Sequence, residues 1–114
     1  MDIYNRTEWT ELPIDGDALV TLSENLLMDF YEADLPELTF SVVTAKEIRE
    51  LNHQFRDVND VTDILSFPAE SEIDPETGIE YLGDLLVCLE RAESQAKEAG
   101  HSLQDEVSLL LIHG

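Results

Sequence analysis

The chain has 114 residues, 43% of them apolar, a size and composition typical of one globular domain and not of a disordered segment. Its longest apolar runs, at 85–89 and 109–112, are far too short to span a bilayer, and the N-terminus lacks the features of a signal peptide. We therefore expect a single domain over residues 1–114, located in the cytoplasm and without a membrane partner.

The charge of the chain is strongly acidic. Six Lys and Arg residues stand against 26 Asp and Glu residues, which gives a net charge of −20. This charge repels nucleic acid at long range, so the composition argues against a polyanion partner unless the few cations are gathered in one place.

Three elements are predicted in the first part of the chain. Residues 2–5 alternate weakly, as an edge strand does. A long amphipathic helix is predicted over 18–33, since Leu19, Leu22, Leu26, Leu27 and Phe30 recur at helical spacing. Residues 37–43 alternate again and predict a half-buried strand.

The next predicted element is a helix over 45–56. Thr44 and Glu47 form a capping box, in which each side chain bonds the backbone of the other residue. At 100° per residue, Ile48, Leu51 and Phe55 share one face, which we expect to pack on the core.

The opposite face of this helix is basic, since it carries Lys46, Arg49, His53 and Arg56. Three of the six Lys and Arg residues therefore lie on one helical face, where they could bind phosphate. The alternative is an ordinary solvated face, in which Lys46 pairs with Glu50 four residues later. The spacing leaves both interpretations open.

The segment after this helix contains Asp57, Asp60 and Asp63, which we expect to fix turns by bonding nearby backbone amides. A short strand follows at 64–68, and then an exposed acidic loop or hairpin at 69–83. The apolar run 83–89 predicts a central strand buried on both faces, in which the single cysteine, Cys88, is a buried thiol.

Two helices close the chain. The first covers 90–100 and ends at Gly100, and we expect His101, which follows it, at the surface. The second is capped by Ser102, with Asp105 three residues on, and buries the stripe formed by Leu103, Val107, Leu110 and Leu111. His113 lies beside this stripe, where a histidine is more often a core residue than a metal ligand. Spacing alone does not decide between the two.

The motifs "LNHQFRDVNDVTDILSFP" (51–68) and "YLGDLLVCLERAESQAKEAGHSLQDEVSLLLIHG" (81–114) resemble the YbeY family of bacterial endoribonucleases that mature ribosomal RNA. In that family the last helix continues as H-G-x-x-H-L-x-G-Y-D-H, whose three histidines hold zinc. The resemblance matches His113 to the first zinc ligand, while the second and third have no position in this sequence. It also matches Arg56 to the family's catalytic arginine.

The resemblance implies zinc-dependent hydrolysis of single-stranded RNA, including small-subunit ribosomal RNA, in ribosome maturation and quality control. Lys46, Arg49 and His53 would then bind RNA. Because one imidazole is a weak ligand, we expect this 114-residue chain neither to hold zinc tightly nor to cleave RNA. The expected fold is α+β, with a mixed sheet of about four strands, surrounding helices and a central C-terminal helix.

Two other functions remain open from the sequence. A zinc peptidase could use a similar helix, although Gly114 stands where such enzymes carry a glutamate base. A non-catalytic acidic module could instead dock on ribosomal proteins through the loop at 70–80.

Overall fold

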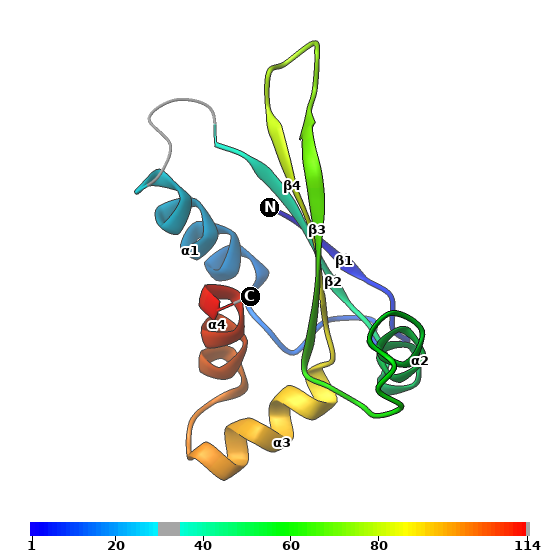
Figure 1. Cartoon of the computed structure of the whole chain (residues 1–114). Helices are drawn as coiled ribbons and strands as arrows, with labels where there is room; N and C mark the ends of the chain where they lie inside the picture. The colour runs from blue at the N-terminus through cyan, green and yellow to red at the C-terminus, as the bar shows by residue number, and fades with distance from the viewer. Residues whose placement is uncertain (30–34, 114) are drawn as a thin grey trace.

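One mixed sheet of four strands organises the molecule, in the order β1-β2-β4-β3 (Figure 1). The computed structural model describes residues 1–29 and 35–113, apart from the side chains of 70–72 and 113. The strands are β1 (Asp2–Asn5), β2 (Glu37–Val42), β3 (Ile64–Ile73) and β4 (Glu80–Val87); the helices are α1 (Gly16–Met28), α2 (Ala45–Arg56), α3 (Leu89–Ala99) and α4 (Leu103–His113). The predicted α+β class is confirmed.

The strand β4 lies inside the sheet, as its apolar run predicts. It pairs in parallel with β2 and antiparallel with β3, while β1 pairs in parallel with β2 at the other edge. Leu85 and Val87 belong to one buried cluster and Leu86 to a second, so β4 is buried on both faces. The strand ends at Val87, two residues earlier than predicted, because Leu89 already begins α3.

The acidic segment 69–83 forms most of a long β-hairpin. β3 continues to Ile73, beyond the predicted end at residue 68, and β4 begins at Glu80. Figure 1 shows this hairpin projecting past the helices. The sequence did not predict these extensions of β3 and β4 because the pairing register shifts between Pro68 and Glu72, which interrupts the alternation of side chains.

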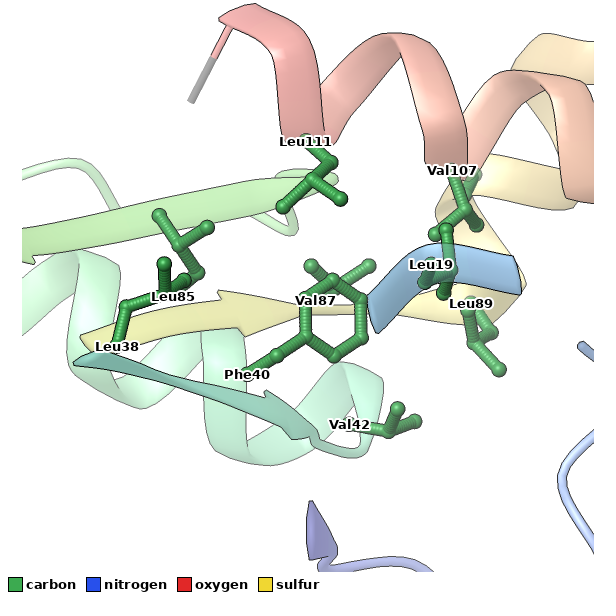
Figure 2. Close-up of a cluster of buried hydrophobic side chains, with 10 residues drawn as sticks. Leu19, Leu38, Phe40, Val42, Leu85, Val87, Leu89, Val107 and Leu111 are labelled. Atoms are coloured by element: carbon green, nitrogen blue, oxygen red, sulfur yellow. The ribbon is translucent and has the colours of Figure 1, made fainter. Parts of the chain in front are cut away.

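Helices cover both faces of the sheet. The first face is packed by α1 and α4, with α4 between α1 and α3 (Figure 1). Figure 2 shows the side chains that meet there, which are Leu19 of α1, Val107 and Leu111 of α4, and Phe40, Leu85 and Val87 of the sheet. On the second face, Ile48 of α2 packs with Leu65, Leu86 and Cys88. None of the helices within the described residues combines the length and apolarity needed to cross a bilayer.

The first helix begins earlier than the predicted residue 18. Asp15 caps it, since its Oδ1 accepts a hydrogen bond from the amide of Ala18 at 3.1 Å. The helix ends at Met28, with Asp29 as its C-cap. The predicted continuation to residue 33, which includes Phe30, falls outside the described residues beyond Asp29.

The helix α2 has the predicted bounds, and the Thr44 half of the capping box is confirmed by the 3.1 Å bond from the Glu47 amide to Thr44 Oγ1. The Glu47 carboxylate pairs with Arg6 and not with the Thr44 amide. The prediction that Phe55 faces the core is wrong, because Phe55 is 59% exposed. Asn52 is buried in the same half of the helix, where its Nδ2 donates to the carbonyl of Asp60 at 3.1 Å. The core contact therefore ends one turn before the helix does.

Candidate nucleic-acid interface

The basic face of α2, defined as Lys46, Arg49, His53 and Arg56, lies on the outside of the molecule. All four side chains are exposed, because α2 packs on the sheet through Ile48 on its other side, where Asn52 is also buried. Over the ten steps from Lys46 to Arg56, an α-helix rises about 15 Å, which is long enough to meet several nucleotides.

The cations of this face are unpaired in the part of the chain that the structure describes. Two cations outside the basic face do form ion pairs: Arg6 pairs with Glu47 of α2, and Lys97 Nζ lies 3.5 Å from Glu93 Oε1. Among the described side chains, no carboxylate lies within ion-pair distance of Lys46, Arg49 or Arg56, so the pair of Lys46 with Glu50 offered by the alternative interpretation does not form. These three charges are therefore available to an anion.

Arg49 is held in place by the segment that follows the helix. Its Nε donates to Oδ1 of Asn59 at 3.0 Å, which leaves the two terminal amino groups of the guanidinium free to form a fork. The segment after α2 is held by Asn52, whose Nδ2 donates to the Asp60 carbonyl. Within this segment, Asp60 Oδ1 accepts a hydrogen bond from the Val61 amide at 2.8 Å. The predicted role of Asp60 in fixing a turn is thus confirmed.

A shallow depression of about 480 Å³ lies between the basic face and this loop. Its lining includes Lys46, Arg49, His53 and Asn59. Sequence reasoning missed Asn59, although an Asn within the Asp-rich turn after a basic helix is a usable signal. Glu50 also lines the depression, so three basic side chains and one carboxylate surround it.

Arg56 occupies the last turn of α2, where its positive charge also interacts favourably with the negative end of the helix dipole. Asp57 then ends the helix in the left-handed conformation, with φ 55°. The neighbouring Phe55 ring meets Phe67 of β3 edge to face, with centroids 5.2 Å apart and an angle of 76° between the planes. Arg56 is thus flanked by an exposed aromatic side chain.

His113 ends α4, and its side chain lies outside the described part of the structure. The helices of His113 and Arg56 cover opposite faces of the sheet. The last described side chains of α4, Leu111 and Ile112, line a cavity of about 370 Å³ together with Ser66, Phe67 and Pro68 of the edge strand β3. Any site that uses both helices therefore has to form around the β3 edge.

The described residues do not fit a zinc ion. No three His, Cys, Asp or Glu side chains among them converge closely enough to bind a metal. Glu106, on the same helical edge as His113, contacts His101 instead. One potential ligand at the end of α4 does not make a metal site.

A second polar cluster joins α3 and α4 to the start of β3. His101, expected at the surface, is only 28% exposed and pairs with Glu106, which is 12% exposed. The amide nitrogen of Gln95, turned toward its acceptors, donates to Glu106 Oε1 at 3.2 Å and to Asp63 Oδ2 at 2.7 Å. The "TD" and "GHS" motifs thus meet in this cluster, which no spacing in the sequence revealed.

Comparison with known proteins supports one family. The endoribonuclease YbeY family profile matches residues 4–114. The endoribonuclease YbeY of Finegoldia magna is 35% identical over 99% of this chain and 73% of its own length. That of Clostridioides difficile is 48% identical over 68% of this chain, but only 52% of its own length. A solution structure of a Thermotoga maritima protein matches with a TM-score of 0.65 and 26% identity, covering 99% of this chain and 67% of that one.

Proposed function

Because the chain belongs to the endoribonuclease YbeY family, we propose that it binds single-stranded RNA along the basic face of α2 and serves the hydrolysis of ribosomal RNA. The observation that carries this proposal is the segregation of three unpaired cations on one helix of a chain with net charge −20. Such a strip attracts the phosphate backbone locally, although the rest of the surface repels it.

We assign a separate role to each cation. Arg49, fixed by Asn59, positions a phosphate in the depression, and Lys46 adds a point charge beside it. Arg56 offsets the charge that develops on the oxygens of the scissile phosphate, as a guanidinium fork does in phosphoryl chemistry. His53 lies between them and supplies a hydrogen bond to the backbone of the RNA.

We further propose that zinc is the metal of the reaction and His113 one of its ligands. This assignment rests on the resemblance of "HG" to the start of the family's histidine motif. The described residues do not assemble a metal site by themselves. The proposed place of the reaction is the maturation and quality control of small-subunit ribosomal RNA in the cytoplasm.

The test is the substitution Arg56→Ala, with Arg91→Ala as its control. Both arginines are exposed on helices, but Arg91 lies on α3, outside the basic face. We expect Arg56→Ala to weaken the binding of single-stranded RNA severalfold and to leave thermal stability unchanged, since an exposed Arg contributes little to folding. Equal RNA affinities of the two variants would contradict the proposal.

A second candidate function follows from the projecting hairpin. The exposed Asp74 and Glu76 lie at its tip, in a chain with a large negative charge, so the hairpin can dock on a basic ribosomal protein. Replacing Asp74 and Glu76 by Asn and Gln separates the two proposals. Loss of ribosome association with unchanged RNA affinity would support docking.

A further inference from the structure

We propose that Phe55 is a stacking platform for one base of the single-stranded RNA whose phosphates meet the basic face. This inference rests on the function proposed above and deepens it, since it assigns a base-binding residue next to Arg56, the last cation of the basic face.

The ring of Phe55 is exposed and yet held in place. It is 59% exposed in the last turn of α2, and its contact with Phe67 fixes its orientation. Phe67 itself is half-buried and packs against the cluster of Ile48, Leu65 and Leu86. A ring that is already ordered loses little entropy when a base stacks on it.

The position of Phe55 on the helix makes this exposure unusual. It continues the apolar stripe of Ile48 and Leu51, which packs on the core, but the core ends before the last turn. The ring therefore leaves a large apolar surface in water. Covering such a surface with a planar group is favourable, because it removes apolar area from water.

The charges around Phe55 identify the occupant. Arg56 is the next residue and points about 100° away around the helix axis, so it is the one cation of the basic face next to the ring, while Lys46 and His53 lie on the opposite side of the helix. Proteins bind single strands by this combination, in which cations track the phosphates and aromatic rings stack on the bases. A basic protein, the partner that a chain of net charge −20 would attract, is repelled by the basic face of α2.

The same reasoning predicts a preference for single strands. In a duplex both faces of each base are already stacked on neighbours, so the ring of Phe55 has no base to cover. The base-stacking contact is available only to unpaired nucleotides.

The experiment compares two labelled oligoribonucleotides of about ten nucleotides, within the range that such sites cover. One carries bases, and the other is abasic with the same sugar-phosphate backbone. Fluorescence anisotropy at low salt measures the affinity of the wild-type chain and of Phe55→Leu, Phe55→Tyr and Tyr4→Ala. Tyr4 is a matched control, since it is 54% exposed but lies on β1, at the edge of the sheet opposite β3.

We expect Phe55→Leu to weaken binding of the base-containing strand about tenfold, because it keeps the apolar contact with Phe67 but removes the aromatic face. Affinity for the abasic strand should not change. Phe55→Tyr should retain the affinity, and Tyr4→Ala should leave both affinities unchanged. Circular dichroism checks that each variant is folded.

Two results separate this inference from the proposed function. If Arg56→Ala weakens RNA binding but Phe55→Leu does not, or weakens the abasic strand equally, the stacking role is overturned while the proposed function stands. If the wild-type chain binds neither strand, both proposals are overturned.

Discussion

The imidazole Nε2 of His101 contacts Oε2 of Glu106 across the turn that joins α3 to α4. The contact is largely shielded from solvent and continues through Gln95 to Asp63, at the start of β3. Asp63 in turn bonds the sheet, since its carbonyl accepts from the Cys88 amide at 2.9 Å. The orientation of α4, which carries His113, is thus fixed by residues from three other segments.

This contact predicts a loss of stability in His101→Ala. Removing the imidazole takes one hydrogen-bond partner from the carboxylate of Glu106, which is largely shielded from solvent, and this should cost about 1–2 kcal/mol of unfolding free energy. Thermal or urea unfolding measures the change. The control is Lys97→Ala, which breaks an exposed ion pair with Glu93 and should have almost no effect. Equal stabilities of the two variants would argue against the cluster.

Gly83 should tolerate no side chain. Its φ is +130°, and a Cβ would lie 2.3 Å from the carbonyl oxygen of Phe67, within the paired strands β3 and β4. We expect Gly83→Ala to lower the unfolding free energy by about 3 kcal/mol. Gly78→Ala is the matched control, since its φ is also positive, at +73°, but a Cβ there meets no atom within 4 Å. A larger loss at Gly78 than at Gly83 would contradict the observed register.

The thiol of Cys88 should be unreactive in the folded protein. It is fully buried, and desolvation by burial raises the pKa of the Cys88 thiol, so the reactive thiolate is scarce near neutral pH. Reaction with a thiol reagent such as DTNB should be slow without denaturant and fast in urea. Because the pKa is raised, the native reaction should accelerate only at alkaline pH. Rapid native labelling at pH 7 would show that the strand end opens.

RNA affinity should depend only shallowly on salt. Three cations, Lys46, Arg49 and Arg56, release few counterions, so the plot of log affinity against log salt should have a slope of about −2 for a single strand. Anisotropy at several salt concentrations measures this slope. A much steeper slope would mean that further cations, such as Arg6 or Arg91, also contact phosphate.

The elements that local signals specify were predicted well. The cap at Thr44 and the helical spacing of the basic face allowed the bounds of α2 to be predicted correctly. The predicted cap at Ser102 is confirmed by the 3.1 Å bond from the Asp105 amide to its hydroxyl. The extent of the β3–β4 hairpin was missed, because its pairing depends on a register shift and on Gly83. Those features act between strands and leave no periodic pattern.

The candidate site was predictable only in part. The clustering of Lys46, Arg49, His53 and Arg56 follows from the 100° turn of a helix, so the sequence alone reveals it. The bond from Arg49 to Asn59 and the exposure of Phe55 depend on where the loop folds and where the core ends. The role of His113 stays a prediction, since its side chain lies outside the described residues.

Zinc binding by this chain should be weak. With no convergent set of three ligands among the described residues, isothermal titration of zinc should reveal no submicromolar one-to-one site. A tight one-to-one site that His113→Ala abolishes would show that residues assigned here to the surface, or a second copy of the chain, supply the missing ligands.

The most direct measurement is a cleavage assay with single-stranded RNA and casein as substrates. It compares this chain with the same chain lengthened past Gly114 by the corresponding segment of the Finegoldia magna relative. We predict that the lengthened chain cleaves the RNA but not casein, that Arg56→Ala in it abolishes cleavage, and that the 114-residue chain cleaves neither substrate. Cleavage of casein, or RNA cleavage that is unchanged in Arg56→Ala, would contradict the assignment of the α2 face to ribonuclease chemistry.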